Sequence, residues 1–144
     1  MEAAEEATGA MEPQIQVKCH EVYGALNRWE KGDFKYGTKD CVSFTVFMIR
    51  ELYGLDYSDQ ITYQSELQAY RIIKKHGGFE NLIDSVLGEP SDVSCTGDPV
   101  MFNHPISGLT MGVKLDEWVI ATTKKGLTRV PCEYIVRVWK CRRF

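Results

Sequence analysis

The sequence predicts one α+β domain, with helices in its first half and an antiparallel sheet in its second half. The chain has 144 residues, of which 44% are hydrophobic, so it has the length of a single domain and enough apolar side chains for one core. Apolar residues recur at helical spacing up to Gly88, whereas short runs rich in Val, Ile, Thr and Trp follow Pro90. Helices followed by strands are typical of an α+β domain and not of an alternating parallel one.

Four amphipathic segments before Gly88 are predicted to be helices. They span residues 14–29, 41–53, 65–75 and 79–87. The second is the most apolar, has no internal Gly or Pro, and ends at Gly54, a residue type favoured just after a helix. We expect it to be the central buried helix. The loop before it contains two glycine turns and brings Cys41 to its first position.

Five short segments after Pro90 are predicted to be the strands of the sheet. They span residues 100–103, 110–115, 118–123, 127–131 and 136–141. Turn residues separate them, so consecutive strands lie close enough in sequence to pair as antiparallel neighbours.

The charge and hydropathy of the chain argue against two classes of partner. The formal net charge is −3 and both signs are mixed along the chain, so we expect no basic surface for nucleic acid. No run approaches the roughly 20 apolar residues of a membrane span, and the N-terminus does not resemble a secretion signal. Residues 1–13 are acidic and poor in apolar side chains, which predicts a flexible tail before a single domain of residues 14–144. We expect the protein to be made in a cytoplasm.

Five cysteines form no C-x-x-C pair and are odd in number, which argues against a disulfide framework and against a zinc site. We therefore expect reduced thiols, no metal and no cofactor. Cys41 is distinguished by its place at the head of the predicted central helix, where backbone N–H groups and the helix dipole stabilise a thiolate. This position suits a nucleophile. The alternative is a small apolar core residue, the commoner role of a cysteine.

Three motifs occur in the order in which NlpC-type peptidases carry them. They are YGTKDCVSF at residues 36–44, GDPVMF at residues 97–102 and MGV at residues 111–113. They resemble the family's Asp-Cys-x-x-Phe helix start, its Gly-Asp-x-Val-x-Phe turn and strand, and its His-Val-Gly-Ile-like strand. The resemblance implies a papain-like fold in which Cys41 is the nucleophile and a histidine from the third motif is the base.

The chain resembles even more closely a short branch of such proteins that is encoded in tailed-phage genomes. The shared features are GGF at residues 77–79, GL at residues 126–127 and VWK at residues 138–140. This resemblance implies a protein of the tail tip or of its assembly, with other tail proteins of the hub or tape-measure region as partners. It also implies synthesis in the host bacterial cytoplasm and a final location in the virion tail.

The histidine of the family is missing from its expected position. Aligning the MGV motif places Thr110 there, and a threonine hydroxyl cannot take a proton from a thiol near neutral pH. His104, at the end of the first predicted strand, is the best substitute base, although a turn separates it from the expected strand. His20 and His76 are expected at the surface or end of a helix.

Further residues have structural and functional interpretations side by side. Asp40 is expected to cap the central helix, and Asp98 to stabilise the turn that contains it. Four aromatic residues could line a sugar- or peptide-binding groove, but core positions are the commoner role of such side chains. These residues are Trp29, Trp118, Trp139 and Tyr36.

The sequence thus predicts a structural or binding protein of a phage tail tip, which retains a peptidase fold without the catalytic pair. This interpretation accounts for both the intact motifs and Thr110. The alternative is an active cysteine hydrolase that cleaves peptides of bacterial peptidoglycan when phage DNA enters the cell, with Cys41 as nucleophile and His104 or a partner's group as base. A more distant alternative is an action on a host enzyme through the acidic residues 2–12.

Overall fold

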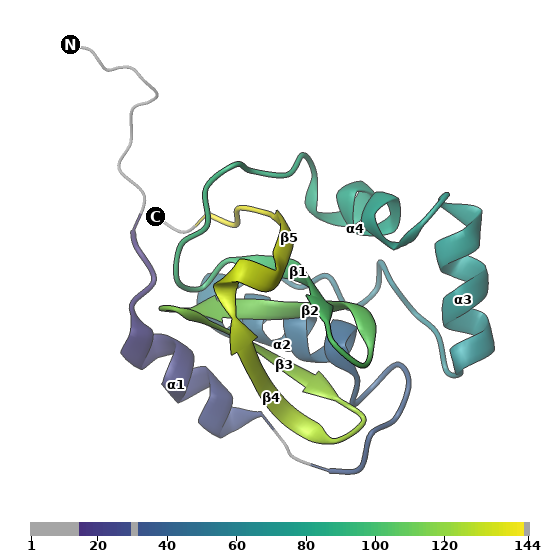
Figure 1. Ribbon diagram of the computed structural model, residues 1–144, viewed down its shortest axis with the longest axis horizontal. Helices are drawn as coiled ribbons and strands as arrows, with labels where there is room; N and C mark the ends of the chain where they lie inside the picture. The colour runs from purple at the N-terminus through teal and green to yellow at the C-terminus, as the bar shows by residue number, and fades with distance from the viewer. Residues whose placement is uncertain (1–14, 30–31, 143–144) are drawn as a thin grey trace.

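The computed structural model describes residues 15–29 and 32–142, and in this part of the chain four helices precede a five-stranded sheet (Figure 1). The helices are α1 (Cys19–Arg28), α2 (Cys41–Tyr53), α3 (Glu66–Lys75) and α4 (Phe79–Leu87). The strands are β1 (Pro99–His104), β2 (Gly108–Leu115), β3 (Trp118–Thr123), β4 (Gly126–Pro131) and β5 (Ile135–Val138), with the short 3₁₀-helix η1 (Cys132–Tyr134) before β5. The predicted α+β class is confirmed. None of the described helices is long and apolar enough to cross a membrane.

The sheet has the strand order β4-β3-β2-β1-β5, and each pair of neighbours is antiparallel. Helix α2 packs Phe44 and Met48 against Val113 of β2, and α1 adds Val22 to the same core. Figure 1 shows α2 behind the sheet, with α1 beside it. A second apolar cluster packs residues of β1, β3, β4 and β5 together. It consists of Val100, Phe102, Val119, Ala121, Val130 and Val138. Burial of these side chains is the main term that stabilises the sheet.

The boundaries of α2, α4 and β3 are those predicted, and the other elements differ at one or both ends. The first helix begins at Cys19 and not at residue 14, because the Glu21 side chain accepts a hydrogen bond from the Lys18 N–H (3.0 Å) and caps the helix there. The last strand ends at Val138 and not at residue 141. Beyond it the Trp139 N–H still donates to the Pro99 carbonyl oxygen (3.0 Å), and the buried Trp139 side chain donates through its indole N–H to Asp84 Oδ1 (2.9 Å). The predicted acidic tail lies outside the described residues.

The sheet separates between β2 and β3. These strands pair only from Val113–Ile120 to Leu115–Trp118, whereas β1 pairs with β2 along its whole length, as β3 does with β4. At the point of separation, a Cβ on Gly112 would lie 2.5 Å from the carbonyl oxygen of Ile120, so only glycine fits there. Beyond this point β2 and β3 are not paired, and the tips of the β1–β2 and β3–β4 hairpins diverge (Figure 1).

Helix α3 lies at the edge of the molecule, next to α4 and away from the sheet (Figure 1). It contains no buried residue, although its side with Ala69, Ile72 and Ile73 is partly covered. The chain passes from α3 to α4 through Gly77 and Gly78, whose positive φ angles of 82° and 134° suit glycine. The inner side of α3 thus faces a space in place of a packed core.

Candidate functional site

Asp40 organises the head of α2. Its Oδ1 accepts hydrogen bonds from the backbone N–H and the hydroxyl of Ser43, both at 2.8 Å, and its Oδ2 accepts one from the Gly37 N–H, also at 2.8 Å. The Asp40 N–H in turn donates to Ser43 Oγ (2.9 Å), which completes a capping box. This network confirms the predicted capping role and fixes the position at which Cys41 begins the helix.

Tyr63 closes the same site from the loop between α2 and α3. Its hydroxyl donates to Asp40 Oδ2, and burial, together with the charge of Asp40, raises the pKa of Tyr63 well above its ordinary value. The backbone of Tyr63 lies directly against Gly37, since a Cβ on Gly37 would lie 2.0 Å from the Tyr63 carbonyl oxygen. Gly37 also has a φ of 88°. The loop that carries Tyr63 can therefore pack directly against the loop before α2 only because residue 37 is glycine.

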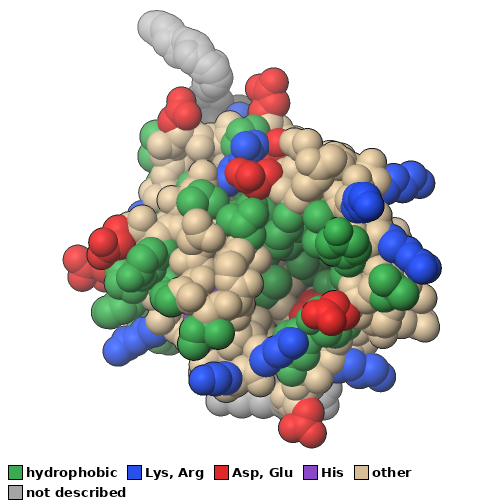
Figure 2. All heavy atoms as spheres, turned by 45° about the vertical axis from the view of Figure 1, so that its right-hand side comes forward, with side chains coloured by type: hydrophobic (Ala, Val, Ile, Leu, Met, Phe, Trp, Pro, Cys, Tyr) green, Lys and Arg blue, Asp and Glu red, His purple; other side chains and the backbone are tan. Residues whose placement is uncertain are grey.

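A cavity of about 480 Å³ lies in front of the head of α2. Figure 2 shows it as a hollow, surrounded by hydrophobic side chains, on the face that carries α3 and α4. Its walls come from the loops on either side of α2, from α3 and α4, and from the tips of the two hairpins. The lining residues are Phe34, Tyr36, Asp40, Cys41, Val42, Ile61, Tyr63, Glu66, Ala69, Ile72, Ile73, Phe79, Leu82, Ile106, Ser107, Leu109, Thr110, Thr122, Thr123 and Lys124. A space of this size and composition is typical of small-molecule and peptide sites.

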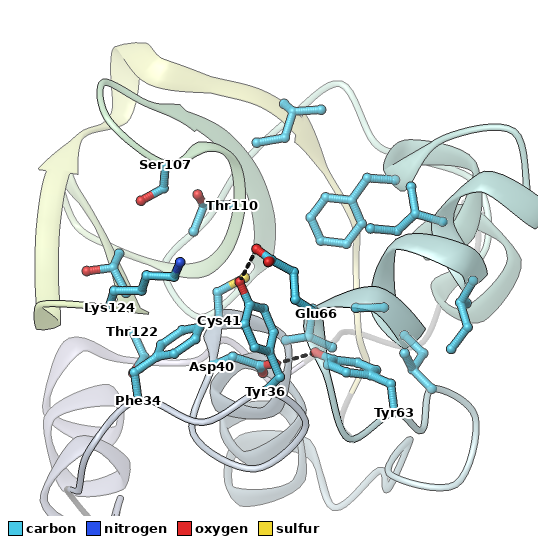
Figure 3. A pocket seen from close by; sticks show the side chains of 18 of the residues that line it. Phe34, Tyr36, Asp40, Cys41, Tyr63, Glu66, Ser107, Thr110, Thr122 and Lys124 are labelled. Atoms are coloured by element: carbon cyan, nitrogen blue, oxygen red, sulfur yellow. Dashed lines mark hydrogen bonds between the residues drawn. The ribbon is translucent and has the colours of Figure 1, made fainter.

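A hydrogen bond spans the cavity between Tyr36 and α3. The Tyr36 hydroxyl donates to Glu66 Oε2 (2.8 Å), as Figure 3 shows. Burial, and then the hydrogen bond to Glu66, raise the pKa of Tyr36 to about 12. This contact ties the first turn of α3 to the loop before α2, at the level of Cys41.

The Cys41 thiol lies at the floor of this cavity, and its surroundings favour the protonated form. Part of the residue's surface is accessible, yet burial raises the pKa of the thiol to about 12, and the charge of Asp40 acts in the same direction. The Met111 N–H lowers the pKa by less than burial raises it but by more than Asp40 raises it, and the N–H groups of Cys41 and Val42 each lower it by less than Asp40 raises it. Thus the negative charge of Asp40, which caps α2, opposes the effect by which the N–H groups of the helix start lower the pKa of the Cys41 thiol. Roughly one thiol in 10⁵ is ionised at neutral pH with such a pKa.

Thr110 borders the cavity but its hydroxyl is already engaged. Its Oγ1 donates to the Gly108 carbonyl (2.9 Å), and Thr110 pairs with Phe102, whose ring packs in the cluster of the sheet's far face. The next residue, Met111, instead packs beside Cys41 and Val42. The equivalence of Thr110 with the family's histidine stays a prediction, and the position provides no proton acceptor strong enough for a thiol.

None of the residues that line the cavity is a histidine. His104 lies at the β1–β2 turn, where its Nδ1 accepts hydrogen bonds from the backbone N–H groups of Ile106 and Ser107, both at 3.1 Å. His76 ends α3 with its Nδ1 3.0 Å from the Ile72 carbonyl oxygen, and His20 is exposed on α1. The structure thus brings Cys41 and Thr110 to one cavity and leaves His104 outside it.

The family of the chain is shown by its sequence match. Residues 19–141, which span all the described helices and strands, match a family described as a domain of unknown function, DUF6950. The chain belongs to this family. No curated protein matches the sequence. The description of DUF6950 names no activity, so the chemistry of the site must be argued from its own residues.

The remaining predicted residues of this DUF6950 domain have mainly structural contacts. Asp98 is buried and its Oδ2 accepts from the Cys95 N–H (2.7 Å) and from Lys140 Nζ (2.6 Å), as expected for a turn-stabilising residue. Two of the three tryptophans, Trp29 and Trp139, lie in the core. Trp118 lies under Arg129, whose guanidinium carbon is 4.4 Å from the ring centroid. Tyr36 alone of the four aromatic candidates lines the cavity.

Most cavity residues of the DUF6950 domain were not predicted from the sequence, among them the polar Tyr63, Glu66, Thr122 and Lys124. They belong to a loop, a helix end and a hairpin, and no motif distinguishes them. The Oγ1 of Thr122 is buried and has no hydrogen-bond partner among the described groups. Within residues 15–29 and 32–142, no group of three or more His, Cys, Asp and Glu side chains could hold a metal ion.

Proposed function

We propose that this DUF6950 domain is a structural protein of a phage tail tip or of its assembly, with an NlpC-like, papain-like fold that does not hydrolyse peptides. One observation carries the second half of this proposal. The cavity that contains Cys41 has no histidine in its lining, and the thiol's pKa is raised to about 12. Loss of a general base typically lowers a rate by about 10²–10⁴-fold, and a protonated thiol is a poor nucleophile.

The first half of the proposal is supported by the sequence motifs. The GGF motif at residues 77–79 forms the junction of α3 and α4. The VWK motif at residues 138–140 connects β5 to α4 through the hydrogen bond from Trp139 to Asp84. In this connection Arg137 pairs with Asp84 (2.7 Å) and Trp139 donates to the same carboxylate. The motifs shared with phage-encoded proteins therefore support the scaffold, in which Phe79 and Trp139 belong to the apolar cluster that also packs against Cys41.

The proposed location is tested on purified phage particles from cells that express the tagged chain together with the tail genes. We expect the chain to remain with the particles through a density gradient and to bind a purified hub or tape-measure protein in size-exclusion chromatography. A chain that stays in the soluble fraction and binds neither protein would refute a tail role.

The proposed lack of hydrolysis is tested separately on purified peptidoglycan. We expect the wild-type domain to release no more soluble peptide than Cys41→Ser, because neither has a working nucleophile and base. The alternative hydrolase is favoured only by the place of Cys41 at a helix N-terminus beside the N–H groups of Met111 and Val42. Peptide release by the wild type that Cys41→Ser abolishes would establish that alternative.

A further inference from the structure

The cavity at the head of α2 has polar side chains on its hairpin side and a mainly apolar wall opposite. The hairpin tips supply Ser107, Thr110, Thr122, Thr123 and Lys124 together with the apolar Ile106 and Leu109, whereas Glu66 is the one polar lining side chain that α3 and α4 supply. Figure 3 shows the four labelled hairpin residues on one side of Cys41 and the α3–α4 side chains on the other. The second wall includes Val42, Ile61, Ile72, Ile73, Phe79 and Leu82.

The orphan hydroxyl of Thr122 is on the polar side. Thr122 is 6% exposed, and its Oγ1 has no hydrogen-bond partner among the described groups. In β3, Thr122 shares a face with Ile120, which pairs with Val113 and packs toward α2, so its side chain is on the cavity side of the strand. A buried hydroxyl without a partner costs about 1–3 kcal/mol, so its presence in a cavity wall indicates a group that is bound there in use.

Lys124 adds a positive charge to the same side of the cavity. It is exposed at the β3–β4 turn, and its Nζ is 5.9 Å from the centroid of the Tyr36 ring, so the side chain reaches across the mouth of the cavity. The two carboxylates of the lining, Asp40 and Glu66, already accept hydrogen bonds, from Tyr63 and Tyr36 respectively. A group that accepts hydrogen bonds and carries negative charge is therefore favoured at Thr122 and Lys124 and disfavoured beside Glu66.

We propose that this cavity binds an amphipathic carboxylate, with its carboxylate at Thr122 and Lys124 and its hydrocarbon chain along the apolar wall of α3 and α4. The hydroxyl and the ammonium both donate to the carboxylate, which satisfies Thr122 Oγ1. The hydrocarbon chain of the ligand covers Ile72 and Ile73 of α3, which are only partly buried in the free protein. This site is independent of a tail role and of hydrolysis, so each of the three proposals can fail without the others.

Decanoate, at concentrations below micelle formation, is the probe for this site, and decanol is its uncharged counterpart. In NMR titrations of the full chain we expect decanoate to bind saturably and to shift the signals of Thr122, Ile72 and Ile73. Decanol is expected to bind about tenfold more weakly, because its uncharged hydroxyl cannot replace the hydrogen bonds that Thr122 and Lys124 donate to the carboxylate of decanoate. No saturable binding, equal binding of decanol, or shifts confined to other residues would overturn the proposal.

Two variants and a matched control separate the polar contacts from general apolar binding. We expect Thr122→Val and Lys124→Gln each to weaken decanoate binding by about tenfold, and only the Lys124 contribution to decrease steeply with added salt. Lys125→Gln changes the neighbouring exposed lysine, which does not line the cavity, and is expected to alter the affinity less than about twofold. Equal effects of the two lysine variants would overturn the assigned position of the carboxylate.

Measurements of the free energy of unfolding distinguish a variant that has lost only ligand binding from a variant that no longer folds. Thr122→Val removes a hydroxyl that lacks a partner, so we expect it to unfold at the same or a higher denaturant concentration than the wild type. Thr110→Val removes a hydroxyl that donates to Gly108 and is expected to lower the free energy of unfolding by about 1 kcal/mol. A Thr122→Val protein destabilised as much as Thr110→Val would show that Thr122 has a partner in the free protein and would overturn the proposal.

Discussion

The Tyr63 hydroxyl donates a hydrogen bond to Oδ2 of Asp40, the residue that caps α2 immediately before Cys41. The two residues are 23 positions apart, and their contact joins the loop after α2 to the head of the same helix. One carboxylate therefore holds the helix start, the preceding loop and a wall of the cavity. Substitutions around it test how the site is built.

Tyr63→Phe is expected to lower the free energy of unfolding by about 1–2 kcal/mol, because it removes one donor from a buried carboxylate. Urea unfolding followed by circular dichroism measures the change. The matched control is Tyr70→Phe on α3, where the side chain is 59% exposed, and there we expect a change within about 0.5 kcal/mol. Equal changes in the two variants would contradict the role of the Tyr63 hydroxyl.

Gly37→Ala is expected to destabilise the domain more than Gly54→Ala. Both glycines have positive φ angles, 88° and 73°, so both variants lose about 1–2 kcal/mol from backbone strain. Only at Gly37 does the new methyl group also meet the Tyr63 carbonyl, whereas nothing lies within 4 Å of a Cβ on Gly54. The steric clash adds about 1–3 kcal/mol or displaces the Tyr63 loop. Equal midpoints of urea unfolding for the two variants would show that the loops do not touch there.

The raised pKa of Tyr36 predicts that the free energy of unfolding decreases at alkaline pH. Its pKa is raised from about 10 to about 12 in the folded protein, first by burial and then by Glu66, so the folded state holds this proton more tightly than the unfolded state. The resulting stability is fully present below about pH 10 and is lost as the pH rises toward 12. We expect the wild type to lose more stability than Tyr36→Phe over this interval in urea titrations at constant ionic strength.

Glu66→Gln tests the second cause of that shift. Glutamine still accepts a hydrogen bond from Tyr36 but carries no charge, so the pKa of Tyr36 is expected to fall toward its ordinary value. Ultraviolet difference titration of the tyrosinate measures this change. An identical titration in wild type and Glu66→Gln would show that Glu66 does not act on Tyr36.

The elements of the fold were predicted where local signals are strong. Helix α2 has a continuous apolar sequence, a capping aspartate before it and Gly54 after it, and its predicted bounds match the structure. β5 was predicted too long, because Trp139 after it is buried by packing with Ile83, Met101 and Met111 and not by continued strand pairing, although its N–H still donates to the Pro99 carbonyl oxygen. Apolar composition alone does not distinguish these two modes of burial.

The cavity could not be predicted from local signals, because its walls come from segments far apart in the sequence. Asp40 was predicted as a cap, but a cap also places a carboxylate beside the thiol, and only the structure shows that burial and this charge outweigh the helix N-terminus. Thr122 lies in a correctly predicted strand. Its unpaired hydroxyl depends on the tertiary structure around it, and no sequence motif predicts it.

The most direct test of the account is the pH dependence of Cys41 alkylation in the native protein. Iodoacetamide labelling followed by peptide mapping measures its rate, with the exposed Cys19 as internal reference. We predict that Cys41 reacts at least about tenfold more slowly than Cys19 near pH 8, and that its rate rises without a plateau to about pH 10, because its pKa is about 12. A Cys41 rate that exceeds that of Cys19 and levels off near neutral pH would reveal an activated thiolate and contradict the proposal of an inactive peptidase-like scaffold.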